Sequence, residues 1–219
     1  MEDAVSTLNQ KAEHLRTPAA IPIACFGMSA GGIGPLKAIV REISTRTGMA
    51  FVVLHLRDVP TMLPEILSTC THMPVELATD KRLIRPNHVY VLPSGMEVRI
   101  NDSSFSLRPR SKRSGFSNVL TIFLESLVDG RHPAVAVILS GVNADGAAAL
   151  RTFERSGGSV IAQAPWTAQQ TDMPLAAIRT GTVNHVLTPQ GIAGQLERIG
   201  REFNEPPNAN KNGQGCKLP

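Results

Sequence analysis

The sequence predicts an α/β fold with a doubly wound, mostly parallel sheet, flanking helices and a small antiparallel meander. Three observations support this prediction. Apolar runs rich in Val and Ile, such as residues 50–54 and 134–139, have the length of strands and are apolar throughout, as strands buried on both faces are. Stretches with helical spacing alternate with these runs. Turn residues at 93–95 and 101–103 divide the middle of the chain into short segments.

In the first half of the chain, strands are recognised as continuous apolar segments and helices by their periodicity. Leu36, Ile39, Val40 and Ile43 follow the i, i+3, i+4, i+7 spacing of an amphipathic helix. Pro64 falls near the start of the next helix, where proline is tolerated. The predicted elements, in order, are a strand at 21–26, a helix around 36–43, a strand at 50–54, a helix at 61–70 and a strand at 75–78.

The second half begins with the predicted meander and then returns to the alternation of strands and helices. The meander comprises the short segments 89–92, 97–100 and 104–108. The later elements are a helix at 118–128, a strand at 134–139, a helix at 145–155, a strand at 159–162, a helix at 175–180, a strand at 183–187 and a helix at 190–203. Because ligands of such sheets bind beyond the carboxyl ends of the strands, polar residues at those ends are the candidates for a site.

The 219 residues fit one domain between two tails. We expect a polar N-terminal tail at residues 1–19, the domain at 20–202 and a disordered tail, rich in Asn, Gly and Pro, at 203–219. The longest apolar runs are only as long as strands, and the N-terminus has no apolar region typical of a signal peptide. The expected location is therefore the cytoplasm, without membrane insertion.

Cysteine content and charge limit the classes of function. Cys25, Cys70 and Cys216 are odd in number and widely spaced, which argues against a disulfide framework and a zinc site. We expect no metal and no cofactor, and Cys25 is predicted to be a core residue. The net charge of +4 is mild and aromatic residues make up only 4% of the chain, so nucleic acid is not an expected partner. The basic run at 108–113 is predicted to be a solvated loop, with contact to an acidic partner as the alternative.

Ser29 follows the first predicted strand in the sequence Gly27-Met28-Ser29-Ala30-Gly31, and a helix follows it. A G-x-S-x-G sequence between a strand and a helix is typical of a nucleophile elbow, in which the flanking glycines permit a sharp turn. The N-terminus of the following helix favours developing negative charge. Two other interpretations remain open from this segment alone. Ser29 could cap the helix, or the glycines could hold a phosphate group.

Two further polar residues follow predicted strands. His55 ends the second strand, where a dinucleotide site would prefer an acidic residue and where an imidazole can act as a general base. Asp145 follows the strand at 134–139; its alternative role is as the N-cap of the next helix. Because a doubly wound sheet brings these strand ends to one edge, Ser29, His55 and Asp145 form a candidate catalytic triad of nucleophile, base and orienting carboxylate. The order Ser, His, Asp differs from the Ser, Asp, His order of α/β-hydrolases.

With these residues in view, the sequence resembles the catalytic domain of the chemotaxis protein-glutamate methylesterase (CheB) family over about residues 21–199. The motifs are Gly27-Met28-Ser29-Ala30-Gly31-Gly32, Val53-Leu54-His55, Arg85-Pro86-Asn87-His88-Val89-Tyr90-Val91-Leu92-Pro93, Ile138-Leu139-Ser140-Gly141 with Asp145-Gly146, Gly157-Gly158 with Ala162-Gln163, and Met173-Pro174 with Ala177-Ile178.

The resemblance implies a serine hydrolase that demethylates glutamate methyl esters on the cytoplasmic helices of methyl-accepting chemoreceptors, often with deamidation of glutamines. It assigns Ser29 as nucleophile, His55 as base, Asp145 as its partner and the backbone N–H of Val142 as an oxyanion donor. The family usually carries an N-terminal receiver domain, and no such domain fits before residue 21. A separate regulatory protein is therefore a second expected partner.

Some positions depart from the usual residues of the family. Ala30 follows the serine where threonine is frequent, Leu54 precedes the histidine where glutamine is common, and residues 116–121 lack the usual proline and aspartate. Asp172 stands where a glycine usually precedes Met-Pro. These departures motivate an alternative function, a catalytically weakened module of the same fold that binds receptors. A nucleotide-binding domain that uses residues 27–34 is a third hypothesis.

Overall fold

The computed structural model describes residues 20–56, 62–110 and 118–204. Its centre is a seven-stranded sheet in which every neighbouring pair of strands is parallel. The spatial order is β3-β4-β2-β1-β7-β8-β9. The strands are β1 (Ile23–Met28), β2 (Ala50–His55), β3 (Val75–Leu77), β4 (Val89–Val91), β7 (Ala134–Ile138), β8 (Ser159–Gln163) and β9 (His185–Leu187). The predicted parallel, doubly wound α/β fold is confirmed.

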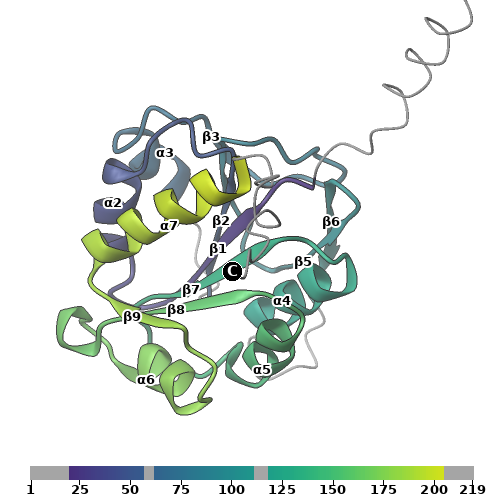
Figure 1. The fold of residues 1–219 in the computed structure, drawn as a ribbon. Helices are drawn as coiled ribbons and strands as arrows, with labels where there is room; N and C mark the ends of the chain where they lie inside the picture. The colour runs from purple at the N-terminus through teal and green to yellow at the C-terminus, as the bar shows by residue number, and fades with distance from the viewer. Residues whose placement is uncertain (1–19, 57–61, 111–117, 205–219) are drawn as a thin grey trace, which may run out of the picture.

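Helices cover both faces of this sheet, as Figure 1 shows. On one face, α2 (Ile33–Glu42), α3 (Leu63–Ser68) and α7 (Pro189–Asn204) pack on a core that includes Phe26 and Val137. On the other face, α4 (Val119–Asp129), α5 (Ala147–Arg155) and α6 (Asp172–Arg179) pack on a core that includes Cys25 and Ala136. Neighbouring residues of one strand thus enter opposite cores, which explains why β1 and β7 are apolar at every position.

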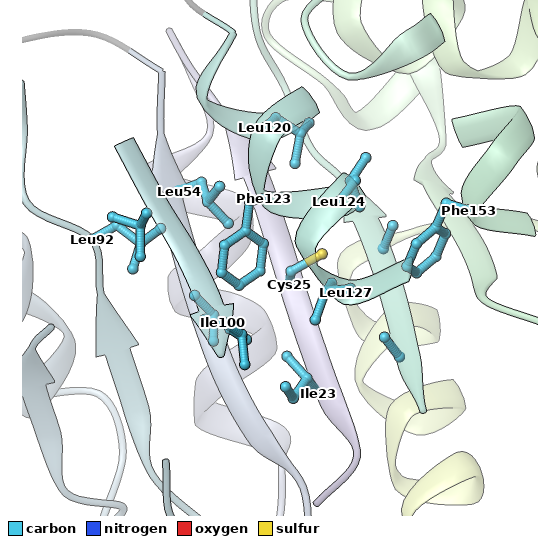
Figure 2. Close-up of a cluster of buried hydrophobic side chains, with 14 of the residues drawn as sticks. Ile23, Cys25, Leu54, Leu92, Ile100, Leu120, Phe123, Leu124, Leu127 and Phe153 are labelled. Carbon is cyan, nitrogen blue, oxygen red and sulfur yellow. The ribbon is translucent and has the colours of Figure 1, made fainter. Parts of the chain in front are cut away.

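The second of these cores is centred on α4. Figure 2 shows Phe123 pointing from α4 toward Cys25, Leu54 and Ile100. Cys25 is fully buried, as predicted from the sequence, and burial raises the pKa of its thiol to about 12. This thiol is a packing group rather than a nucleophile.

The antiparallel part of the fold is smaller than the sequence predicted. Among the described residues, only β5 (Met96–Asn101) and β6 (Ser104–Pro109) form an antiparallel pair of strands. The first segment of the predicted meander is instead β4, which lies between β2 and β3 in the parallel sheet. Its three residues are all buried, as an internal position in the sheet requires. A short apolar segment has no periodicity that distinguishes these two placements.

The structure corrects several predicted boundaries. The strand predicted at 21–26 is β1, at Ile23–Met28, and the strand predicted at 183–187 is β9, at His185–Leu187. The helix predicted from Asp145 begins at Ala147, and Gly146, with a φ of 86°, is its N-cap residue. Residues 203 and 204, predicted to lie in the C-terminal tail, are the end of α7. The helix predicted at 175–180 is α6, which begins at Asp172. The remainder of both predicted tails, and residues 111–113 of the basic run, lie outside the described residues.

None of the helices in the described ranges has both the length and the apolar character needed to span a bilayer.

Candidate active site

The middle of the sheet provides a crevice at the carboxyl ends of its strands. The chain leaves β1 toward β2 on one side and later returns to β7 on the other side, so β1 and β7 flank the point where the winding reverses. Ser29 directly follows β1, and its N–H donates to the carbonyl oxygen of Ser140, two residues beyond β7, at 3.0 Å. This backbone bond fixes the serine at the reversal point.

The turn that holds Ser29 is tight, which explains its glycines. Gly31 has a φ of 79°, and a Cβ there would lie 2.6 Å from the Ser140 hydroxyl oxygen and 2.7 Å from the Gln169 Cβ. Both the backbone conformation and the space exclude a larger residue. The N–H of Gly32 closes the turn by donating to the Ser29 carbonyl oxygen at 3.1 Å.

The helix-cap interpretation of Ser29 is wrong. The N-cap residue of α2 is Gly32, and no side chain makes a capping hydrogen bond there. Ser29 lies three residues earlier and is only 2% exposed. The serine is therefore available for a role other than helix capping.

His55 and Ser29 line the same cavity. His55 is the last residue of β2 and pairs in register with Met28, the residue before the serine. The cavity has a volume of about 660 Å³ and is open to solvent. Its lining residues are Ser29, Ala30, Gly31, Ile33, Gly34, Pro35, His55, Thr167 and Gln169. A general base and a hydroxyl nucleophile at one cavity are the groups that acyl transfer needs.

The structure places Asp145 at the start of α4, and it is not among the residues that line this cavity. Its carboxylate accepts hydrogen bonds from the backbone N–H groups of Leu120 at 3.0 Å and Thr121 at 3.2 Å, and from the Thr121 hydroxyl at 2.8 Å. Asp145 thus caps α4 rather than α5, the helix that follows it in the sequence. Asn118, the N-cap residue of α4, makes no side-chain cap bond of its own. Within the described residues, no hydrogen bond joins this carboxylate to His55.

Two opposing effects act on the Asp145 carboxyl. Burial raises its pKa, and the hydrogen bonds from Leu120 and Thr121 partly offset that increase because they favour the ionised form. An ionised carboxylate has about four acceptor positions. Leu120 and Thr121 use three of them, and the backbone N–H of Gly146 also favours the ionised form.

Thr121 is a residue of the site that sequence reasoning missed. Its hydroxyl donates to Asp145 and also accepts the Gly146 N–H at 3.1 Å, so it joins α4 to the loop after β7. It belongs to the stretch that departs from the usual family residues, and only its contact with Asp145 indicates a role.

The loop after β7 presents a backbone donor near the serine. The Gly141 N–H donates to the carbonyl oxygen of Gln170 at 3.2 Å, whereas no described residue accepts the N–H of Val142, the next residue. A Cβ on Gly141 would clash with the Met173 sulfur and lie 3.0 Å from the Ser29 Cβ. Glycine at this position therefore lets the loop approach the serine closely.

Gln163 belongs to the motif Gly157-Gly158 with Ala162-Gln163, but the sequence predicts no role for it. It is fully buried at the end of β8, and its side-chain oxygen accepts the Ser140 N–H at 2.9 Å. Its amide nitrogen donates to the Thr167 carbonyl oxygen at 2.9 Å. Since Ser140 in turn binds the Ser29 N–H, this glutamine ties the cavity wall at Thr167 to the nucleophile turn. A buried polar residue at a strand end is the sequence signal for such a role.

The comparisons with known proteins agree on one family. The family model for CheB methylesterase matches residues 24–196. A Leptospira interrogans protein, whose name assigns it provisionally as protein-glutamate methylesterase/protein-glutamine glutaminase, is 31% identical over 180 residues, covering 80% of this chain and 92% of that protein. The Hahella chejuensis protein-glutamate methylesterase/protein-glutamine glutaminase 3 is 31% identical over 189 residues, covering 81% of this chain but only 52% of its own length.

A solved structure supports the fold. The catalytic domain of the Thermotoga maritima CheB methylesterase matches with a TM-score of 0.73 at 24% identity, over 81% of this chain and 97% of that domain. The resemblance identified from the sequence motifs is therefore confirmed. The chain belongs to the CheB methylesterase family.

Proposed function

We propose that this chain is a cytoplasmic serine hydrolase that cleaves glutamate methyl esters on the cytoplasmic domain of methyl-accepting chemoreceptors. The observation that carries the proposal is that Ser29 and His55, from adjacent strands, line one open cavity at the carboxyl edge of the sheet. Membership of the CheB methylesterase family supports the ester as the substrate.

In the proposed mechanism, Ser29 Oγ attacks the γ-carbonyl carbon of the ester while His55 takes its proton. The tetrahedral intermediate collapses as His55 returns that proton to the methoxide, which leaves as methanol. The glutamyl group is then an ester of Ser29. His55 activates a water molecule that attacks this acyl-enzyme, and the products are free glutamate and the restored serine.

The N–H of Val142 is the proposed donor to the oxygen that becomes negative in the intermediate. Its position beside the serine and the lack of an acceptor among the described residues support this role. One such donor typically lowers the barrier by about 3–4 kcal/mol. The N-terminus of α2, which starts at Ile33 on the cavity wall, adds a favourable dipole.

Asp145 is the proposed partner of His55. The hydrogen bonds from α4 hold the carboxylate in place, so that it can orient the imidazole and stabilise its charged form. In this arrangement Asp145 has two roles, one as the cap of α4 and one as the group that stabilises the imidazolium.

The substitution Thr121→Val tests the proposed role of Asp145 in stabilising the imidazolium. It removes the hydroxyl that favours the ionised form of Asp145, so the pKa of that carboxyl should rise further. More of the enzyme then carries a neutral Asp145 at acid pH, so the acid limb of the kcat/KM profile should move to higher pH. We expect kcat to fall about tenfold with KM nearly unchanged, because the variant loses about one charge-assisted hydrogen bond. Steady-state kinetics across pH measures both effects.

Thr121→Ser is the matched control, because it keeps the hydroxyl and should restore the profile. An acid limb that stays in place in Thr121→Val would show that Asp145 does not act through its charge in the reaction.

A receptor-binding module with weak activity is the second candidate. It is favoured by one observation, that the Asp145 carboxylate is bound at α4 and makes no hydrogen bond to His55 within the described residues. Such a module would bind receptor and release little methanol.

Methanol release from membranes that carry methylated chemoreceptors separates these candidates. The proposal predicts release that depends on this protein, with sedimentation of the protein together with the membranes. Co-sedimentation without methanol release would favour the binding module. The absence of both co-sedimentation and methanol release would contradict the receptor as substrate. Release of ammonia from receptor glutamines, measured in parallel, tests the glutaminase activity named for the relatives.

A further inference from the structure

Three large apolar side chains are exposed on residues in or next to the lining of the candidate active site. Ile33 is 37% exposed, Val142 49% and Trp166 79%. These three residues, called the apolar collar below, follow the carboxyl ends of β1, β7 and β8 respectively. The three strands are consecutive in the sheet, so the collar runs along one edge. Exposed apolar residues gathered at one place mark a binding surface more often than scattered ones do.

The collar is continuous with the reaction cavity. Ile33 lines the cavity together with Ser29 and His55, and so does Thr167, the residue after Trp166. Val142 follows Gly141, where an added Cβ would lie 3.0 Å from the Ser29 Cβ, so another collar residue lies near the serine. A polypeptide whose ester reaches Ser29 therefore has to lie against the collar.

Trp166 is held firmly despite its exposure. It is the middle residue of a short 3₁₀ turn (Pro165–Thr167) in which the Thr167 N–H donates to the Ala164 carbonyl oxygen at 2.9 Å. Gln163 holds the Thr167 carbonyl oxygen from the buried side. An exposed tryptophan on a fixed backbone beside a catalytic cavity presents a large contact area at a low cost in backbone entropy.

The position of Ser29 in the sheet excludes recognition by strand addition. β1 is the fourth of seven strands, with three strands between it and each edge. A peptide paired with β3 or β9 would lie about 19 Å from β1, at about 4.8 Å per strand. The substrate of the proposed function carries its esters on helices, and a helix needs no strand partner because its backbone hydrogen bonds are already made. Three consecutive strand ends span about 10 Å, close to two turns of helix.

We infer that the apolar collar, and Trp166 above all, selects substrate helices that carry apolar side chains one turn to either side of the methylated glutamate. This inference rests on the proposed function and adds a specificity determinant to it. Residues at i±3 and i±4 share the helix face of the ester and would pack on the collar when the ester enters the cavity.

The test uses the full chain with Ser29→Ala, which permits binding without hydrolysis. Two synthetic peptides carry one glutamate methyl ester, are held helical by a staple on the far face, and differ only in leucine or serine at i±3 and i±4. Trp166 is the single tryptophan of the chain, so its fluorescence reports on this surface alone. We expect the leucine peptide to shift its emission to shorter wavelength and to bind about 30-fold more tightly than the serine peptide.

Trp166→Ala in the same background, measured by anisotropy of labelled peptide, should lose most of that preference. Phe203→Ala is the matched control, since Phe203 is 48% exposed but lies with Ala134 and Ser159, the first residues of β7 and β8, at the opposite edge. It should bind like the parent. Circular dichroism melting checks that Trp166→Ala is folded.

Equal affinity for the two peptides, or an unchanged preference in folded Trp166→Ala, would overturn the inference. Failure of the proposed function is a separate result, because it appears as absence of methanol release by the wild-type chain, whereas the binding assay does not require hydrolysis.

Discussion

Replacing Ser29 by alanine is expected to lower kcat/KM for glutamate methyl esters by about 10⁴-fold or more. The substitution removes the only atom that can form the acyl-enzyme in the proposed mechanism and leaves His55 without its proton donor. Ser29 is 2% exposed and its backbone N–H still donates to Ser140, so the alanine form should keep the fold.

Methanol release from a synthetic peptide ester measures this effect. Ser106→Ala is a suitable control, because Ser106 lies on β6, away from the crevice, and this variant should match the wild type. Circular dichroism melting should give the same midpoint for Ser29→Ala and wild type. Activity retained in folded Ser29→Ala at more than a few per cent would rule out the serine as nucleophile.

Replacing Phe123 by alanine should lower the free energy of unfolding by about 3–5 kcal/mol, the usual cost of removing a buried aromatic ring. Phe123 is completely buried and lies between α4 and the sheet, next to Cys25, Leu54 and Ile100 (Figure 2). α4 also supplies the N–H groups that bind Asp145, so a loosened α4 should affect the candidate site as well.

Urea unfolding followed by circular dichroism gives this value if the transition is two-state. Phe203→Ala removes the same ring from an exposed position at the end of α7 and should cost less than about 1 kcal/mol. Similar losses in the two variants would contradict the central role of Phe123 in the core.

The parts of the fold that the sequence predicted well are those with long, uniform patterns. β1, β2 and β7 are five or six residues long and almost entirely buried, and continuous apolar runs of this length are typical of strands buried on both faces. β4 shows where this reasoning fails. Its three residues have the composition of a strand, but pairing with β2 and β3 rather than with β5 depends on contacts across the fold. Composition does not encode such a choice.

The same distinction applies to the candidate site. Ser29 and His55 directly follow or end strands that are adjacent in the sheet, so strand order alone brings them together. Asp145 is different, because its carboxylate also binds the start of α4, which lies far away in the sequence. Thr121 and Gln163 likewise bind residues more than 20 positions away, Asp145 and Ser140 respectively. No spacing rule predicts them, which is why the sequence alone did not assign them a role.

The central claim is that Ser29 carries the acyl group during ester hydrolysis. Its most direct test is to treat the protein with a fluorophosphonate that mimics the glutamate ester and to map the adduct by mass spectrometry while methanol release is followed. The account predicts one adduct per chain, on the peptide that contains Ser29, with release falling in proportion to labelling. Full release from protein in which Ser29 is completely modified, or loss of release with the adduct on another residue, would contradict it.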